Sequence, residues 1–387
     1  MSKLFVGNFD FEHQLRGGEA FTLPVHLRRR NVELSFLWTA LAQDGDFILG
    51  DAGVDAEFFR ISQRQGLPRL NLIAPGEAIP AALELCPWGW SNEMRQWGAQ
   101  HRCTVNAPEE NAVWRSNSRR FSFACERDWD VALPDAAEFV DLNTLRQHLR
   151  DVCRPETRWV IKAEFGMSAR ERILGQGAFV SANDVNWLQR RLARGQRLYF
   201  EPWVEKIVEA GLQFSIPPTG EPQFAGCTEL LTDARGQYRG SRWSDHLQAE
   251  WDTEITCGIR VAGEVQRMGY FGPLGIDAMR YRDDSGEVRS RPIQDVNARW
   301  TMGRLALECQ RFVPEGSCFS LLHLAASDEP LTMPVKDCLR FLPDYLTWGA
   351  GSRERLKQQV YLSWAETEAE LTANEKLLAG NNILAGE

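Results

Sequence analysis

The sequence predicts a mixed protein of two or three domains that opens with an α/β unit and later contains an antiparallel hairpin. Its 387 residues leave room for two or three hydrophobic cores, at about 150 residues per domain. Hydrophobic residues make up 43% and charged residues 25% of the chain, which is typical of a folded globular protein rather than a disordered one. The hairpin follows from two apolar-rich stretches that flank the turn residues 283–286.

The charge and the hydrophobic pattern exclude several classes of partner. The formal net charge of −9 and the isoelectric point near 5.4 argue against nucleic acid, whose binding draws on clustered lysine and arginine. No stretch approaches the roughly 18 consecutive apolar residues of a membrane span, and residues 1–13 carry acids where a signal peptide needs an apolar run. We therefore expect a cytoplasmic protein with no nucleic acid and no membrane partner.

Nine cysteines are scattered through the chain, an odd number with no C-x-x-C pair. That spacing favours reduced, mostly buried thiols over disulfides or a zinc site. The six histidines are scattered as well, and neither a Ser-His-Asp nor a Cys-His signature points to a protein nucleophile.

Residues 1–106 alternate short apolar runs with glycine and proline, a pattern that predicts an α/β unit. Loops after the strands of a parallel sheet gather at its carboxyl edge, where ligands bind, and the segments GNFDFEH and RGGEAF are candidates for such loops. A dinucleotide fingerprint, G-x-G-x-x-G, is absent. Trp88 and Trp90 flank a glycine and are expected to form a packing corner, with stacking on a substrate as the alternative.

A second block opens with the adjacent arginines Arg119 and Arg120. They precede a charged amphipathic helix that the pattern predicts within 133–153, next to an Asp and Asn pair suited to capping. Arginines at this point either meet phosphates or lie on the surface.

Lys162 ends an apolar strand in the run WVIKAEFG. Residues 166–177 then supply three glycines, the hydroxyl of Ser168 and two arginines, Arg170 among them. Such a loop can hold phosphate oxygens through backbone N–H groups and charge. It is not a Walker A loop, and a glycine-containing hairpin turn explains the pattern nearly as well.

A short hinge, EPWV, follows a strand expected at 197–201 and contains Glu201, Trp203 and Val204. An acid followed by an apolar hinge can offer adenine one backbone donor and one acceptor within an apolar slot, and Glu209 could then accept from ribose hydroxyls. The alternative is a connection between elements whose acids are solvated.

The predicted hairpin has its strands at 276–281 and 288–297, and it carries acids at both ends. Folding brings Asp277, near the start of the first strand, close to Asp295 and Asn297 at the end of the second. The last two side chains are two residues apart and so point to one face. Two carboxylates and an amide oxygen are ligands that suit Mg²⁺ beside a nucleotide. We therefore predict a magnesium site here.

Arg299 follows on the same alternation and is a candidate cation for a phosphoryl group. The D-x-N-x-R run is a weak signal alone, because Asp and Asn are also common turn formers. The cationic and glycine-rich features upstream, at Arg119, Lys162 and residues 166–177, strengthen the interpretation of this run as a phosphate and metal site.

Two further segments have no clear chemistry. Residues 217–268 are polar and glycine-bearing and could form an insertion over the active site, where Arg239 and Arg242 recognise a substrate carboxylate, or a solvated loop. The tail 366–387 is expected to form a terminal helix or helix pair that packs on the protein or makes an oligomer contact, such as that of a homodimer.

Taken in order, these features resemble the ATP-grasp superfamily, and the match covers about residues 107–310. The resemblance rests on Arg119, Lys162, the glycine-rich loop 166–177, the hinge 201–204, Glu209, Asp277 and the D-x-N-x-R run 295–299. It implies an α/β plus α+β fold in which two subdomains clamp the nucleotide. The implied parts are an N-terminal pre-ATP-grasp α/β domain (1–106), a small ATP-grasp subdomain (107–200), a C-terminal subdomain with the metal-binding hairpin (201–325) and a C-terminal helical extension (326–387).

The resemblance also implies roles for individual residues. ATP would be bound by residues from both subdomains, namely Arg119, Lys162, Ser168, Arg170, Glu201, Trp203, Val204 and Glu209. Magnesium would be held by Asp277, Asp295 and Asn297, and Arg299 would brace the transferring phosphoryl group as the catalytic cation.

Two positions depart from the family pattern. Asp295 stands where glutamate is more usual, so its carboxylate is one methylene shorter. Arg119 stands where lysine is frequent, and Arg120 beside it leaves the assignment open by one residue. Neither change removes a charge.

The implied reaction is that a substrate carboxylate attacks the γ-phosphate of ATP, which gives an acyl phosphate and ADP, after which an amine, or less often a thiol, displaces phosphate. The expected cofactors are ATP and Mg²⁺, and the expected partners are a small-molecule or peptide carboxylate and an amine acceptor. A small-molecule kinase on the same scaffold and a non-catalytic nucleotide-binding protein remain alternatives.

Overall fold

The first part of the chain forms a parallel sheet with strand order β4-β2-β1-β5. The computed structural model describes residues 1–17, 22–50, 52–74, 76–166, 171–233, 236–326, 337–348 and 351–380. The four strands of this sheet are β1 (Lys3–Val6), β2 (Phe47–Leu49), β4 (Asn71–Ile73) and β5 (Glu84–Pro87). The helices around it are α1 (Phe11–Gly17), α2 (Val25–Ser35), α3 (Ala56–Arg64) and α4 (Asn92–Gln100). The predicted N-terminal α/β unit is therefore confirmed.

Trp88 closes the end of this sheet as the expected packing corner. Its ring centroid lies 4.6 Å from that of Phe9 and 5.8 Å from that of Trp38, and the ring is almost fully buried. The aromatic contacts fix the chain where it leaves β5, which is the carboxyl edge of the parallel sheet.

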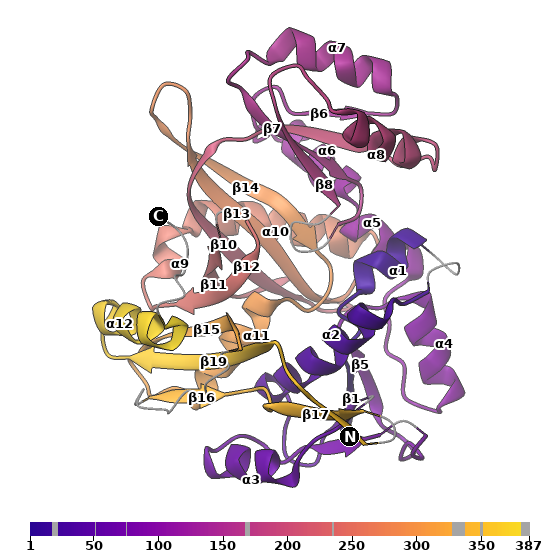
Figure 1. The fold of residues 1–387 in the computed structure, drawn as a ribbon, viewed down its shortest axis with the longest axis vertical. Coiled ribbons are helices and arrows are strands. Elements are labelled where there is room, and N and C mark those ends of the chain that lie inside the picture. Colours follow the sequence, from indigo (N-terminus) through magenta and orange to yellow (C-terminus); the bar gives the residue numbers. More distant parts are fainter. Residues whose placement is uncertain are drawn as a thin grey trace.

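A second four-stranded sheet has the order β6-β9-β7-β8 and is antiparallel throughout. Its strands are β6 (Ala137–Phe139), β7 (Arg158–Ala163), β8 (Arg172–Gln176) and β9 (Leu198–Pro202). Helices α7 (Leu142–Val152) and α8 (Ala182–Leu192) cover it and share its core. Figure 1 shows this unit standing at one end of the molecule. Helices α5 (Glu110–Asn117) and α6 (Arg119–Asp128) lead into it.

The helix expected within 133–153 is shorter than predicted. Residues 137–139 form β6, and α7 begins only after Asp141, whose carboxylate accepts hydrogen bonds from the backbone N–H groups of Asn143 and Thr144. The apolar residues of AEF pair with β9 instead of continuing the helical stripe.

Gly175 in β8 allows the Trp159 ring to pack directly on the backbone. A Cβ atom at this position would lie 2.1 Å from the ring, and the Trp159 indole, which donates to the Gly177 carbonyl at 2.7 Å, cannot move freely. We expect Gly175→Ala to lower the free energy of unfolding by about 1–3 kcal/mol through overpacking. Chemical denaturation measures this. Gly263→Ala, on the open face of a helix, is the control and should not destabilise the protein.

The third and largest sheet is antiparallel, with the order β14-β13-β10-β11-β12-β15-β19-β16. Its strands are β10 (Glu205–Ile216), β11 (Gln223–Thr232), β12 (Tyr238–Trp243), β13 (Gly272–Arg282), β14 (Val288–Asn297), β15 (Cys318–Ala325), β16 (Cys338–Arg340) and β19 (Gln358–Ala365). Helix α10 (Asp252–Arg267) packs against it, and α9 (Leu247–Glu250) and α11 (Met302–Glu308) complete this part.

Two expectations about this region are wrong. The segment 217–268 is not an insertion, because it supplies the central strands β11 and β12 and the packing helix α10. The segment 326–387 is not a helical extension, because it supplies strands of the large sheet as well as the terminal helix α12 (Glu368–Ala379).

The C-terminal segment also contacts the beginning of the chain. Strands β17 (Tyr345–Trp348) and β18 (Ser352–Arg355) form a small sheet with β3 (Ala52–Gly53) from the N-terminal unit. One hydrophobic cluster joins the N-terminal unit to the large sheet, with Trp38 and Phe319 among its fully buried members. Within the described residues, no helix is long and apolar enough to cross a membrane.

Candidate active site

The hairpin of β13 and β14 brings its polar side chains together. Asp277 and Asp295 are opposite each other in the strand register, and the Asn297 amide nitrogen lies 3.5 Å from an Asp277 carboxylate oxygen. The second strand has the predicted bounds. The first strand begins earlier, at Gly272, so Asp277 lies in the middle of it rather than near its start.

The electrostatics of this pair fit a hard cation. Burial, together with the negative charges of Asp295 and Glu209, raises the pKa of Asp277 to about 7, although Arg299 opposes the shift. The Asn297 carbonyl oxygen accepts from Arg299 at 2.8 Å and keeps a second lone pair. No group of three or more His, Cys, Asp or Glu that could hold a metal occurs in the described ranges. A divalent cation here would therefore use two carboxylates and one amide oxygen, a donor set that suits Mg²⁺.

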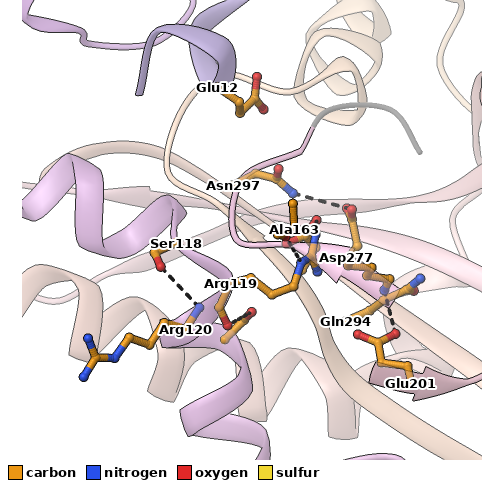
Figure 2. A network of polar contacts seen from close by, with 12 residues as sticks. Glu12, Ser118, Arg119, Arg120, Ala163, Glu201, Asp277, Gln294 and Asn297 are labelled. Carbon is orange, nitrogen blue, oxygen red and sulfur yellow. Dashed lines mark hydrogen bonds and ion pairs between the residues drawn. The ribbon is translucent and has the colours of Figure 1, made fainter. Parts of the chain in front are cut away.

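Arg119 reaches the same point from the other subdomain. It is the first residue of α6, whose N-cap Ser118 accepts from the backbone N–H of Arg120 at 3.2 Å. Its guanidinium donates to Asp295 at 3.3 Å and to the Ala163 carbonyl at 3.3 Å. Figure 2 shows the side chain extending from α6 towards Asp277 and Asn297. Arg120 is exposed, so the open assignment falls on Arg119.

Lys162 on β7 belongs to a buried ionic network. Its ammonium lies 2.6 Å from the Glu201 carboxylate, which Arg291 also contacts at 2.9 Å, and Arg291 makes two further hydrogen bonds to Glu126. Although burial alone would favour a neutral carboxyl, Arg291 and Lys162 hold the pKa of Glu201 well below its usual range. The network joins β7 and β9 of the small sheet to β14 of the large one.

The residues predicted to form an adenine-binding hinge make other contacts in the structure. Glu201 lies within β9, and its carboxylate is bound by Lys162 and Arg291. The backbone N–H of Trp203 donates to the Arg158 carbonyl at 2.9 Å and is therefore not free for a ligand. The Trp203 ring lies under the guanidinium groups of Arg158 and Arg172. Val204 packs with Met279. These three hinge residues are not among those that line the cavity described below.

Glu209 on β10 does face the cavity. One of its carboxylate oxygens lies 2.7 Å from the Lys206 ammonium, and the other accepts from the Gln294 amide at 3.2 Å. The carbonyl oxygen of Gln294 is buried and has no hydrogen-bond partner among the described residues. The predicted Ser168 and Arg170 lie outside the described residues.

Arg299 is held by the N-terminal unit. Its guanidinium donates to Glu12 on α1 at 2.6 Å, and it lies over the Trp88 ring at 5.7 Å from the centroid. Glu12 lies within the GNFDFEH segment that the sequence placed at the ligand-binding edge, but nothing in the pattern distinguished it from the neighbouring acids. Arg299 therefore connects the hairpin, through Asn297, to the N-terminal unit, through Glu12.

Side chains from the hairpin, α6, β7 and β10 line one cavity of about 710 Å³, a size typical of small-molecule sites. At one end it contains the polar residues of both subdomains, which are Arg119, Lys162, Arg172, Glu209, Asp277, Gln294, Asp295, Asn297 and Arg299. Arg239, one of the two arginines suggested to recognise a substrate carboxylate, also lines this cavity. Arg242 does not, because its guanidinium is bound to Glu375 on α12 at 3.1 Å.

Comparison by sequence matches no family model and no curated protein. Comparison by structure gives several similar proteins. Biotin carboxylase from Campylobacter jejuni, in complex with β-γ-ATP, is 12% identical with a TM-score of 0.57 over 89% of this chain and 88% of that one.

Two further structures are similar over comparable lengths. The biotin carboxylase domain of 2-oxoglutarate carboxylase from Hydrogenobacter thermophilus, with MgADP, ADP and bicarbonate, is 11% identical with a TM-score of 0.57 over 89% and 86% of the chains. The ADP complex of N5-carboxyaminoimidazole ribonucleotide synthetase is 11% identical with a TM-score of 0.52 over 90% and 94%. At such identities the comparison establishes a shared fold.

Proposed function

Since the chain has the ATP-grasp fold, we propose that it is an ATP-dependent, ADP-forming ligase. It activates a substrate carboxylate as an acyl phosphate, which an amine then attacks. One observation carries the proposal above the others. The carboxylates of Asp277 and Asp295, from the large sheet, meet Arg119 and Lys162, from the small subdomain, in one cavity.

The proposed cofactors are ATP and Mg²⁺. The similar structures were solved with ATP, ADP or MgADP, and the donor set of Asp277, Asp295 and Asn297 fits magnesium. Bound there, Mg²⁺ would neutralise charge on the phosphate oxygens. Lys162 and Arg119, from the small subdomain, would bind phosphate oxygens beside it.

The residues contribute mainly position and charge. Phosphoryl transfer passes through a loose transition state whose charge is spread over several oxygens, so fixed cations lower the barrier without a protein nucleophile. Arg299, held by Glu12 and Asn297, is pre-oriented to meet that charge. Its tethering removes the entropy that a free side chain would lose.

The test is a screen of carboxylates, each with and without amines, in the presence of ATP and Mg²⁺. The expected result is carboxylate-dependent release of ADP and a condensed product detected by mass spectrometry. A phosphorylated product without an amine would show a kinase instead. ATP binding with no turnover on any carboxylate would favour a non-catalytic nucleotide-binding protein.

We predict that Lys162→Met weakens ATP binding at least about tenfold. A hydrogen bond to a charged group contributes about 1.5–3 kcal/mol, and Lys162 is the cation that β7 presents to the cavity. The variant should fold, because Glu201 keeps Arg291 as its partner. Isothermal titration calorimetry measures the dissociation constant, and Lys376→Met on the exposed face of α12 is the control. An unchanged constant would remove Lys162 from the site.

A further inference from the structure

The cavity has a second end that is rich in positive charge. We call it the cationic end and define it by Arg29 and Arg30 of α2, Arg239 of β12, Arg355 at the end of β18, and the nearby Lys357. Figure 1 shows α2 lying between the strands of the N-terminal parallel sheet and the large sheet. Three separate parts of the chain thus direct cations into one volume.

The carboxylates around this end do not balance those cations. Glu33 and Glu354 are the acids that line the cavity there, and with Asp233 beside Arg239 the five cationic side chains face three acidic ones. Arg29 pairs with Glu354 at 3.1 Å, and Arg239 pairs with Asp233 at 2.9 Å. Burial raises the pKa of Glu33, against the pull of Arg30, Lys357 and Arg29, which favours its neutral form. A positive excess in a protein with a net charge of −9 is a local feature that attracts anions.

A buried histidine at this end has an unused hydrogen-bonding atom. His323 of β15 lines the cavity and packs edge-on against Tyr238, with ring centroids 5.2 Å apart. Its Nε2 is buried and has no hydrogen-bond partner in the described part of the chain. Burial and the charge of Arg30 lower the pKa of His323 to about 3, so the ring is neutral. An orphaned buried nitrogen is costly unless a ligand satisfies it.

The cationic end lies well away from the magnesium ligands. Asp277 is on β13 and His323 on β15, and these strands are separated by four strand spacings in the large sheet. At about 4.8 Å per spacing, the two strands are about 19 Å apart across the sheet. The amine, the reacting carboxylate and the γ-phosphate all need to meet near Asp277, so the reacting groups do not occupy the cationic end.

We propose that the cationic end binds a second anionic group, a carboxylate or a phosphate, at the far end of an elongated carboxylate substrate. This inference rests on the proposed ligase function for the reacting end. The substrate would span the face of the large sheet, with its reactive carboxylate near Arg299 and its distal anion among Arg29, Arg239 and Lys357. His323 would make one hydrogen bond to the distal group and so select its position.

The test uses anionic peptides as probes. An extended peptide covers about 3.3–3.6 Å per residue, so hexaglutamate spans the distance and diglutamate does not. We expect the MgADP-loaded protein to bind hexaglutamate, or a hexaglutamine peptide with a distal phosphoserine, at least about tenfold more tightly than diglutamate or plain hexaglutamine. The two long anionic probes distinguish a carboxylate from a phosphate as the distal group.

A double variant, Arg239→Gln with Lys357→Gln, should abolish most of this preference, and its binding should lose most of its salt dependence. The matched control, Arg267→Gln with Lys376→Gln, removes the same charge from exposed positions outside the cavity and should bind like the parent. His323→Phe keeps the contact with Tyr238 but removes the nitrogen, and we expect a loss of about three- to tenfold in affinity for the preferred probe. Thermal unfolding confirms that each variant is folded.

The two proposals fail in different ways. ATP binding to a protein that does not distinguish long from short anions, or an equal loss in the double variant and its control, would overturn the distal anion site and leave the ligase intact. Absence of ATP binding would overturn the ligase. Each peptide is also titrated without nucleotide, so the cationic end is still tested in that case.

Discussion

Replacement of Asp295 by asparagine is expected to reduce ATP turnover by on the order of 10²–10³-fold or more, which is the usual cost of removing one charge that stabilises a transition state. The change keeps the shape of the side chain and an oxygen that accepts from Arg119, so the fold should persist. It removes one of the two carboxylates that would hold Mg²⁺. Single-turnover formation of ADP, at limiting and at saturating Mg²⁺, measures the effect.

Asp284→Asn is the matched control, because it makes the same change in the exposed turn of the same hairpin. It should leave turnover and its magnesium dependence as in the parent protein. Full activity of Asp295→Asn at limiting Mg²⁺ would contradict the assignment of the hairpin as the metal site.

Replacement of Arg291 by methionine is expected to cost about 3–5 kcal/mol in the free energy of unfolding, the range found when a buried charge loses its partner. Arg291 is almost fully buried, and it hydrogen-bonds to both Glu126 and Glu201. Without it Glu126 is a buried carboxylate, and Glu201 keeps only Lys162. Denaturation in urea, monitored by circular dichroism, measures the loss.

Two further variants separate the ionic network from a general effect of losing an arginine. Arg289→Met, two residues away on the exposed side of the hairpin, should leave the unfolding midpoint nearly unchanged. Adding Glu126→Gln to Arg291→Met should restore part of the stability, because it removes the carboxylate left unpaired. No recovery in the double variant would show that packing, not charge, causes the loss.

The hairpin could be predicted from the sequence because its signals are local. The turn residues between 283 and 286 fix the loop, and the spacing of two places Asp295 and Asn297 on one face. The alternation does not extend back to Arg291, because the register of β13 and β14 shifts between Asp295 and Arg291, and Ile293 lies in the hydrophobic core. The buried network around Arg291 therefore had no signal in the sequence.

The remaining contacts could not be predicted because they join distant parts of the chain. Glu12 and Arg299 are 287 residues apart, and no local pattern links them. The position of the hinge residues outside the cavity could not be predicted for a related reason. Whether Glu201 faces a ligand or the interior depends on Arg291 from another strand, and a carboxylate with two buried cations beside it turns inward.

The C-terminal segment has a structural consequence for any shortened form of this protein. Strand β19 lies between β15 and β16, and its first residue, Gln358, lines the cavity together with the preceding Lys357. A truncation that ended at the boundary of the family resemblance, near residue 310, would remove β15 as well and leave the backbone groups of β12 as an open edge prone to aggregation. It would also leave the hairpin of β13 and β14 in place while removing one wall of the cavity. The smallest unit that keeps the whole cavity therefore extends well beyond residues 107–310.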